Sequence, residues 1–366
     1  MANQQDSVPF QHGAAGHEGL TSNASGTILT KPCTEAEIAF YESAASDPAH
    51  SDFYAHMPTF LGALRPAADQ AGLSKLLHGS DGVGTVPAGQ EDSKEESAAG
   101  KEQGPASAGD QAIPLAPGEE WTPSGGKKLS TGLAICLENT ASGCTKPCVL
   151  DIKLGARLWD DDAPLAKRQK LDEVASSSTS GSLGFRVAGM KVYVGTEAEA
   201  QKLRPEEDGF VKEKDGYKTY DKFYGRQFKG EDDVTKAFEA YLPSTGSKYR
   251  EEVRKRFIRE LESVEYVLEN TESRMYSASL LFVYEGDEQA LAKALEYDKK
   301  LDEEGDDDEG EADGPKDEND EDIEPKVHDL KLIDFAHARW AKGEGRDENA
   351  LRGVKNCLKI MRAVVG

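Results

Sequence analysis

Apolar and charged residues alternate over Pro147–Gly155, the stretch PCVLDIKLG, which is bounded by a proline and a glycine. This pattern predicts a short buried strand. Asp151 and Lys153 are two residues apart, so a strand places both side chains on one face while Ile152 and Leu154 point to the other. Two interpretations remain open at this point, a surface strand with a cross-strand ion pair and a functional site.

Two other stretches carry apolar residues at helical spacing. From Tyr249 to Asn270 the apolar positions fall three or four residues apart, and the same spacing recurs from Glu348 to Val365. Both stretches are predicted to be amphipathic helices. A third helix is predicted after Thr34, because threonine is a preferred capping residue and Glu37 stands three residues further on.

Short apolar runs predict further strands. One follows a glycine turn at Gly26 and ends at Lys31, whereas the serine-rich residues 176–182 are predicted to be a loop. The other runs are Phe53–Leu64 (a strand and a turn), Leu129–Leu137, Leu183–Val194 (a strand pair), Tyr276–Tyr284 and Asp329–His337. Because side chains alternate along a strand, we expect Ser277 and Ser279 to face the same way.

Composition changes this picture in two places. Residues 79–126 are rich in Gly, Ala, Ser, Glu and Pro, and residues 302–324 hold 15 acidic residues against one lysine. Neither segment has enough apolar surface to offset the entropy lost on ordering. We therefore expect a low-complexity insert and an acidic disordered insert.

The charge outside these segments is small. Of the net charge of -24, the two segments carry -7 and -14, which leaves -3 for the rest of the chain. Such a body can contain a basic pocket but is unlike a nucleic-acid footprint, so no direct nucleic-acid binding is expected. The five cysteines include no CxxC pair. With no leader pattern and no apolar run of about 18 residues, we expect a soluble intracellular protein without a transmembrane segment.

A basic cluster follows the central strand. It consists of Lys167, Arg168 and Lys170, in a helix predicted to begin near Asp160–Pro164, where acids and an early proline favour an N-terminus. Three interpretations are open for it, a solvated face, a nuclear-localisation patch and an anion-binding face. The aromatic and basic stretch Tyr220–Arg226 is more typical of core aromatics with flanking charges than of a nucleic-acid site.

The order of these parts resembles that of a two-lobed nucleotide-binding enzyme. Kinases hold nucleotide, metal and acceptor with a strand lysine, a helix glutamate, a hinge turn and late acidic residues. Here the polar turn Glu138-Asn139-Thr140 would be the hinge. The chain lacks GxGxxG, GxxxxGK[ST] and HRD motifs, so neither the protein-kinase glycine loop nor a P-loop is present.

Three motifs resemble those of the inositol polyphosphate kinases. PCVLDIKLG fits their PxxxDxKxG signature, SASLL at Ser277–Leu281 resembles SSLL, and LIDFAH at Leu332–His337 matches IDFAH. The resemblance runs from about His17 to the end, and the TSGSLGFR and GMK segments and the acidic insert are most similar to the fungal multikinases of that family. It implies an α+β, two-lobed, protein-kinase-like fold of antiparallel sheets with helices, using ATP and Mg²⁺.

The resemblance implies a role for each matching residue. Lys31 would hold the nucleotide phosphates with Glu37 as its helix partner, and Asp151 would contact the ribose. The hinge that binds adenine through its backbone would be Glu138, Asn139 and Thr140. Lys153 and Asp334 would be catalytic, Lys153 at the transferred phosphoryl group and Asp334 at the metal with Ser279 nearby. The substrate-binding residues would be Lys153, Lys167, Arg168, Lys170, Lys222 and His337.

The implied domain organisation has two lobes. The first lobe comprises residues 1–78 and, after the insert at 79–126, residues 127–139 with the hinge. The second lobe, 140–366, holds the inositol-phosphate-binding segment 156–182 and the acidic insert 302–324. Two positions depart from the family pattern, since Ala278 replaces the first serine of SSLL and Asn139 stands where relatives often have Asp.

The expected activity is ATP-dependent transfer of the γ-phosphoryl group to hydroxyls of inositol phosphates such as a trisphosphate and a tetrakisphosphate. A mostly lysine pocket should accept phosphates at differing ring positions, because lysine is a mobile point charge. Phosphoinositide lipids are a further substrate class that the resemblance implies. The alternatives are an inositol hexakisphosphate kinase and a transcription-linked scaffold whose acidic run binds basic partners such as transcription factors. The expected location of the protein is the nucleus and cytoplasm. The acidic run also has a simpler interpretation as a solubilising spacer.

Overall fold

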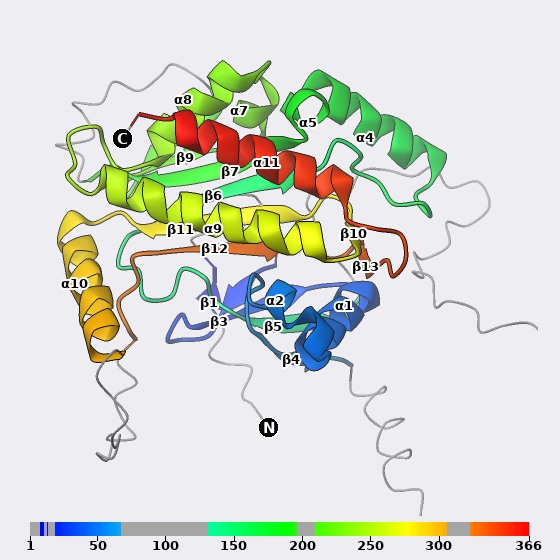
Figure 1. Cartoon of the computed structure of the whole chain (residues 1–366), viewed down its shortest axis with the longest axis horizontal. Helices are drawn as coiled ribbons and strands as arrows, with labels where there is room; N and C mark the ends of the chain where they lie inside the picture. The colour runs from blue at the N-terminus through cyan, green and yellow to red at the C-terminus, as the bar shows by residue number, and fades with distance from the viewer. Residues whose placement is uncertain are drawn as a thin grey trace, which may run out of the picture. The chain divides into compact units, whose positions relative to one another are not determined.

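The computed structural model describes residues 8–10, 13, 19–66, 131–195, 209–305 and 323–365. The predicted insert at 79–126 and residues 306–322 of the acidic run lie outside these ranges. Contacts divide the chain into a unit of residues 1–64 and 121–366 and another of residues 65–120. All elements below belong to the first unit, whose α+β architecture combines antiparallel sheets with helices (Figure 1).

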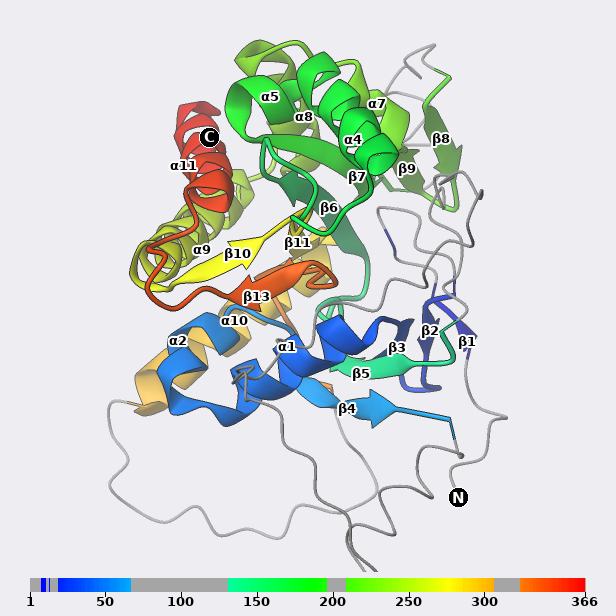
Figure 2. The same ribbon diagram turned by 90° about the vertical axis from the view of Figure 1, so that its right-hand side faces the viewer.

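A five-stranded antiparallel sheet contains the strand predicted to end at Lys31. Its members are β1 Val8–Pro9, β2 Thr21–Ser22, β3 Ile28–Pro32, β4 Phe60–Leu64 and β5 Ala134–Glu138. They lie in the order β1-β2-β3-β5-β4. Between β3 and β4 the chain forms α1 Glu35–Ser46, a 3-10 turn at Pro48–His50 and α2 Ser51–Tyr54. Helix α1 packs against β4 (Figure 2).

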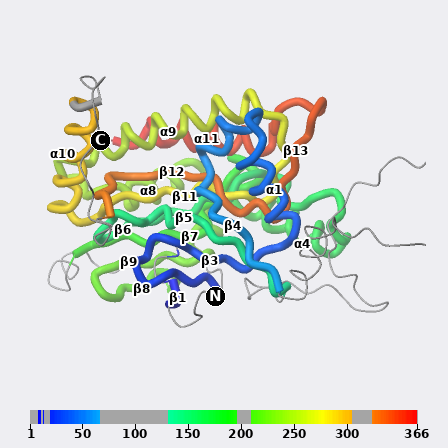
Figure 3. Tube along the Cα trace, turned by 90° about the horizontal axis from the view of Figure 1, so that it is seen from below, coloured from blue at the N-terminus to red at the C-terminus, as the bar shows by residue number. Residues whose placement is uncertain are grey.

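A six-stranded antiparallel sheet carries the other motifs. Its members are β6 Pro147–Leu154, β7 Phe185–Tyr193, β8 Val211–Lys214, β9 Tyr217–Tyr220, β11 Ser279–Glu285 and β12 His328–Ile333. They lie in the order β12-β11-β6-β7-β9-β8, and β10 Ser273–Met275 pairs separately with β13 Ala338–Trp340. Residues 139–146 lead from β5 into β6 and so connect the two sheets (Figure 3).

Helices pack on the six-stranded sheet and on one another. They are α4 Leu165–Ser177, α5 Thr179–Leu183, α7 Lys222–Arg226, α8 Glu231–Tyr241, α9 Arg250–Asn270, α10 Glu288–Gly305 and α11 Glu348–Ala363. Helices α9 and α11 pack on each other, α9 contacts β12, and α11 contacts β6 and β7. None of the helices in the described part of the chain has the length and apolarity needed to cross a bilayer.

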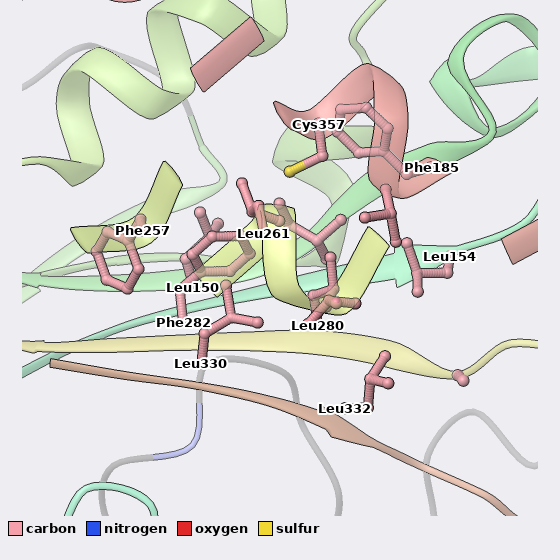
Figure 4. Packing of buried hydrophobic residues seen from close by; sticks show 14 of the residues in the cluster. Leu150, Leu154, Phe185, Phe257, Leu261, Leu280, Phe282, Leu330, Leu332 and Cys357 are labelled. Atoms are coloured by element: carbon pink, nitrogen blue, oxygen red, sulfur yellow. The ribbon is translucent and has the colours of Figure 1, made fainter. Parts of the chain in front are cut away.

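The apolar core lies between these helices and the sheet. Leu150 of β6, Phe282 of β11 and Phe257 of α9 are completely buried in it (Figure 4). Full burial of such side chains contributes about 1.5–3 kcal/mol each. Because strand side chains alternate, anchoring Leu150 in this core turns Asp151 and Lys153 to the opposite face of β6.

The strongly periodic predictions are confirmed. Helix α9 occupies Arg250–Asn270, within the predicted range, and α11 occupies Glu348–Ala363. The predicted central strand is β6, and β12 ends at Ile333, immediately before Asp334. Thr34 caps α1, and its hydroxyl oxygen accepts a hydrogen bond from Glu37 N, as the capping pattern predicts.

Predictions around the serine-rich stretch are wrong. Residues 176–182 are largely helical, because Ser178 caps α5 by accepting a hydrogen bond from Ser180 N. Gly184 then ends that helix in a left-handed conformation with φ 74°. The stretch predicted as a strand pair is the single strand β7, and Gly189 sits opposite Asp151 beside a register shift rather than at a turn.

Three further boundaries differ from the predictions. Phe53 lies in α2, and a strand begins only at Phe60. Ser277 lies outside β11 with φ 59°, so it does not alternate in register with Ser279. Helix α10 continues to Gly305, so the acidic run begins as helix rather than as disordered chain.

Candidate active site

Four charged side chains from α1 and both sheets meet at one point. Lys31 Nζ lies 2.7 Å from Glu37 Oε1 and 2.8 Å from Asp334 Oδ1. Lys153 Nζ lies 2.5 Å from Asp334 Oδ2. The side chain of Glu37 is 1% exposed, and that of Asp334 is 11% exposed. One largely buried carboxylate therefore binds two ammonium groups.

The local backbone fixes this arrangement. Lys31 lies in β3 and Glu37 in the first turn of α1, so the cap at Thr34 sets the distance between them. Asp334 has φ 67°, a left-handed conformation that Asp adopts more readily than most residues. Phe335 N, next in the chain, donates a hydrogen bond to Glu37 Oε1 at 3.3 Å. The turn after β12 is thus tied to α1.

The electrostatics of this cluster keep Lys31 charged. Burial alone would lower the pKa of Lys31, but the carboxylates of Asp334 and Glu37 outweigh it and raise this pKa well above its ordinary value. Two cations and two anions compensate one another in the cluster. The ammonium groups of Lys31 and Lys153 could bind the oxygens of an incoming polyanion. The carboxylate of Asp334 could bind a divalent cation.

A cavity lies next to this cluster, and its empty space, open solvent at the mouth included, is about 770 Å³. Its charged groups are Lys31, Asp151, Asp334 and Glu138, the last residue of β5. Its walls are mostly apolar and come from both sheets: Leu29, Leu137, Val149, Leu281, Val283 and Ile333. The arrangement suits a flat apolar ring attached to an anionic group.

The predicted hinge forms one wall of this cavity. Glu138, Asn139 and Thr140 all line it. Asn139 is held by its backbone N–H, which donates to Thr27 O at 2.8 Å, and by Nδ2, which donates to Gly26 O at 2.6 Å. The backbone N–H of Thr140 donates no hydrogen bond to any other described residue. It is therefore available to a ligand in the cavity.

Asp151 is 3% exposed and also lines the cavity. It stands on β6 opposite Leu281 of β11, one of the apolar wall residues. This placement combines a carboxylate with the apolar wall, as the predicted ribose contact requires.

Hard oxygen donors for a divalent cation are present next to Lys153. Ser279 is fully buried and pairs with Lys153 on one side and Ile333 on the other, so its side chain shares their face. Its hydroxyl makes no hydrogen bond to any other described residue. The described ranges contain no cluster of three or more His, Cys, Asp or Glu residues that could hold a metal. A cation at Asp334 and Ser279 would complete its shell with phosphate oxygens and water, as Mg²⁺ commonly does.

The predicted substrate-binding residues separate into different environments. Lys167 Nζ lies 3.3 Å from His337 Nε2, which connects α4 to the turn after β12. Arg168 Nε donates to Ala163 O at 2.7 Å, so this guanidinium binds the loop before its own helix. Lys170 is exposed and pairs with Glu173 at 3.0 Å.

Lys222 begins α7, and its ammonium lies 5.6 Å from the centre of the Phe223 ring. The predicted substrate role of Lys222 stays a prediction.

Two residues near the site were missed at the sequence level. Asp160 Oδ2 lies 2.5 Å from His337 Nδ1, although the sequence suggested only an acid at a helix start. Arg186 lies opposite Lys153 on β7, and burial and the charge of Arg226 lower its pKa to about 10. Periodicity reveals neither contact, because both depend on the pairing of distant segments.

A third missed residue contacts the hinge. Lys326 Nζ donates to Thr140 O at 3.3 Å and lies 3.7 Å from Glu138 Oε1. Lys326 lies two residues after the acidic run, and nothing in the sequence around it predicted a contact with the hinge.

Comparisons with known proteins identify a matching family and several similar relatives. A family model described as inositol polyphosphate kinase matches residues 134–362. The inositol polyphosphate multikinase of Saccharomyces cerevisiae is 30% identical over 96% of this chain and 96% of its own length. Inositol hexakisphosphate kinase 3 of Mus musculus is 28% identical over 63% of this chain and 50% of its own length.

A solved structure is also similar. The crystal structure of the inositol phosphate multikinase Ipk2 from S. cerevisiae, in complex with ADP and Mn²⁺, has a TM-score of 0.57 and 27% sequence identity. The match covers 92% of this chain and 99% of that chain.

Proposed function

This chain belongs to the inositol polyphosphate kinase family and is a phosphotransferase with an alcohol group as acceptor, and from that premise we propose that it is an ATP-dependent multikinase. Its acceptors would be inositol phosphates such as a trisphosphate and a tetrakisphosphate, and its metal would be Mg²⁺. The observation that supports this best is the bridge from Lys31 through Asp334 to Lys153 at the charged end of the cavity.

The cavity supports a nucleotide as donor. Its apolar walls from both sheets would hold the adenine, and the Thr140 N–H would donate to a ring nitrogen. Asp151 would accept from ribose hydroxyls. Lys31 would then bind the phosphates, with Glu37 keeping its ammonium in place.

Phosphoryl transfer needs positioning and positive charge more than covalent help from the protein. Lys153 sits on a strand anchored in the core, so its ammonium would approach the transferred group in a fixed direction. A divalent cation held by Asp334 and Ser279 would offset the charge of the phosphate oxygens. Lys31 and Lys153 would exchange part of their contact with Asp334 for phosphate.

The acceptor side favours a multikinase over a hexakisphosphate kinase. The match to the multikinase relative covers 96% of this chain. The match to the hexakisphosphate kinase relative covers 63% of this chain and about half of that relative. From α4 it is a lysine, Lys167, that reaches His337, while Arg168 binds its own loop. Mobile lysines tolerate phosphates at several ring positions, which supports acceptance of more than one acceptor.

Purified wild type and Asp334→Asn would be tested with ATP, Mg²⁺ and one acceptor at a time. The acceptors are an inositol trisphosphate, an inositol tetrakisphosphate, inositol hexakisphosphate and a phosphoinositide in vesicles. We expect Asp334-dependent phosphorylation of the first two. Turnover of hexakisphosphate alone would replace the multikinase with the hexakisphosphate kinase, and no turnover of any acceptor would refute the kinase proposal. The vesicle reaction decides the predicted lipid substrate.

A further inference from the structure

Three side chains form a line of contacts at the start of α4. His337 Nδ1 lies 2.5 Å from Asp160 Oδ2, and His337 Nε2 lies 3.3 Å from Lys167 Nζ. Asp160 belongs to the loop between β6 and α4, and His337 to the turn between β12 and β13. The contacts therefore connect the loop that leads into the basic helix with the turn that carries Asp334.

The chemistry of the two outer groups determines where the imidazole proton lies. A carboxylate can only accept hydrogen bonds, and an ammonium can only donate them. The nitrogen that faces Asp160 must therefore carry a proton, and the nitrogen that faces Lys167 must offer its lone pair. Of the two neutral tautomers, the one with its proton on Nδ1 suits an acceptor at Nδ1 and a donor at Nε2, whereas the opposite tautomer suits neither. The 2.5 Å approach of Nδ1 to Asp160 is an ion-pair contact in which the N–H is not aligned on the carboxylate oxygen.

We propose that Asp160 is a positioning residue that fixes His337 in the Nδ1–H tautomer, so that Nε2 accepts a hydrogen bond from a hydroxyl of the acceptor ring. Lys167, the resting partner of Nε2, would turn to a phosphate of the same acceptor. The assignment of ring hydroxyl and phosphate rests on the proposed function, since an inositol phosphate offers both groups side by side.

The burial and charge of Asp160 suit this role. Its side chain is 19% exposed, and that of His337 is 29% exposed, so water competes little for their contact. The hydrogen bond from His337 lowers the pKa of Asp160, which keeps the carboxylate ionised and able to accept. Carboxylates that orient a histidine in this way are common partners of functional histidines.

Other contacts hold the loop that carries Asp160. Asn349 Oδ1 accepts from Ala156 N and Arg157 N, both at 2.9 Å. Gly155, with φ 95°, leaves no room for a side chain, because a Cβ there would lie 2.5 Å from Asn349 Nδ2. Arg168 holds the far end of the loop at Ala163 O. These contacts support the loop, so Asp160 is not its main support, although the backbone N–H of Ala163 also stabilises the Asp160 carboxylate.

The tautomer can be measured without turnover. The full-length chain, labelled with ¹⁵N at its seven histidines, would be studied by long-range ¹H–¹⁵N correlation NMR, with His337→Gln to assign the signals. We expect the Nδ1–H tautomer in wild type and a shift toward Nε2–H in Asp160→Ala. Asp162→Ala removes the same charge from an exposed position of the same loop and should leave the signals unchanged. An Nε2–H tautomer in wild type, or no change in Asp160→Ala, overturns the proposal.

Kinetics then test the consequence for the acceptor. Asp160→Ala should raise KM for the inositol phosphate about tenfold, the size expected when one hydrogen bond to the acceptor is lost. KM for ATP should stay near the wild-type value. The effect should be absent in a His337→Gln background, because Asp160 acts through that ring. Additive effects, or equal changes in both KM values, would show that Asp160 has only a structural role.

These measurements separate the inference from the proposed function. If wild type phosphorylates no inositol phosphate, the proposed function fails while the NMR experiment still decides the tautomer. If wild type is active but the tautomer is unaffected by Asp160→Ala, the function stands and the inference fails.

Discussion

The ammonium of Lys31 lies 2.8 Å from Asp334 Oδ1, which joins β3 of the five-stranded sheet to the residue that follows β12 of the six-stranded sheet. The second oxygen of Asp334 is taken by Lys153. One carboxylate thus aligns a lysine from each sheet at the charged end of the cavity. The same carboxylate is the oxygen donor to which we assign the metal.

Asp334→Asn should therefore lower kcat strongly. The amide keeps the shape of the side chain, but it removes the charge that holds both lysines and would hold the cation. We expect a loss on the order of 10²–10³-fold, as for the removal of other preorganised electrostatic groups. Steady-state kinetics with an inositol trisphosphate would measure it.

Asp232→Asn is a matched control, because Asp232 is exposed on α8 and the same charge is lost. Its kcat should equal that of wild type. If Asp334→Asn retains wild-type kcat with an unchanged melting temperature, the carboxylate does not hold the cation.

Lys153→Ala should abolish turnover while nucleotide binding persists. Asp334 would keep Lys31 as a partner in this variant, so the buried carboxylate would not be left uncompensated. ADP affinity measured by titration calorimetry should stay within about threefold of wild type, a difference of under 1 kcal/mol. If the variant shows no cooperative thermal unfolding transition, the ion pair of Lys153 with Asp334 has a structural role instead.

The basic helix allows a comparison between two lysines of one turn. Lys167 reaches His337, whereas Lys170 is exposed and paired with Glu173. Lys167→Ala should raise KM for the inositol phosphate about tenfold or more, since a charge-assisted contact of roughly 1.5–3 kcal/mol is lost. Lys170→Ala should change it less. If the two substitutions raise KM equally, the whole predicted cluster of Lys167, Arg168 and Lys170 binds the inositol phosphate.

The residues of this site were predictable where local patterns determine geometry. The capping pattern at Thr34 sets the contact between Lys31 and Glu37, and period two along β6 puts Asp151 and Lys153 on one face. Both consequences follow from a few consecutive residues. The motif resemblance added Asp334, which no local pattern would have paired with Lys31.

Contacts between distant segments were not predictable in this way. Asp160 meets His337 only because the loop after β6 packs beside the turn after β12, and no spacing in the chain encodes that. The helix α5 was missed for a different reason. Serine and glycine favour loops, but Ser178 and Gly184 act here as the caps of a short helix.

The stability of the protein should depend on pH through His56. Its Nε2 lies 2.9 Å from Ser263 Oγ of α9, and burial lowers its pKa. A histidine with a lowered pKa binds fewer protons in the folded state than in the unfolded chain. Stability is then fully present above the unfolded pKa of about 6.5 and is lost as pH falls from there toward the folded pKa.

His56→Gln tests this dependence. The amide can bond to Ser263 but does not titrate, so the fall in stability below about pH 6.5 should become shallower. Urea midpoints across this range would be compared for the two proteins. Parallel curves would mean that other groups carry the pH dependence.

Lys326 should control nucleotide affinity from outside the cavity. Its ammonium binds Thr140 O at 3.3 Å and Asp329 Oδ2 at 2.9 Å, and Glu138 is 3.7 Å away. Burial would lower the pKa of Lys326, but Asp329 and Glu138 raise it above its ordinary value, so the residue is charged. The contact with Lys326 fixes the carbonyl of Thr140, and with it the backbone of a residue that lines the cavity.

Lys326→Met keeps the length of the side chain and removes this contact. We expect the Kd for ADP to rise about five- to tenfold, since a hydrogen bond to a charged group contributes roughly 1.5–3 kcal/mol and part of it is shared with Asp329. KM for the inositol phosphate should not change, because Lys326 contacts the hinge and not helix α4, which carries Lys167. Lys299→Met, at an exposed position of α10, is the matched control. If Lys326→Met weakens acceptor binding as much as ADP binding, the effect comes from the fold as a whole and the hinge is not its cause.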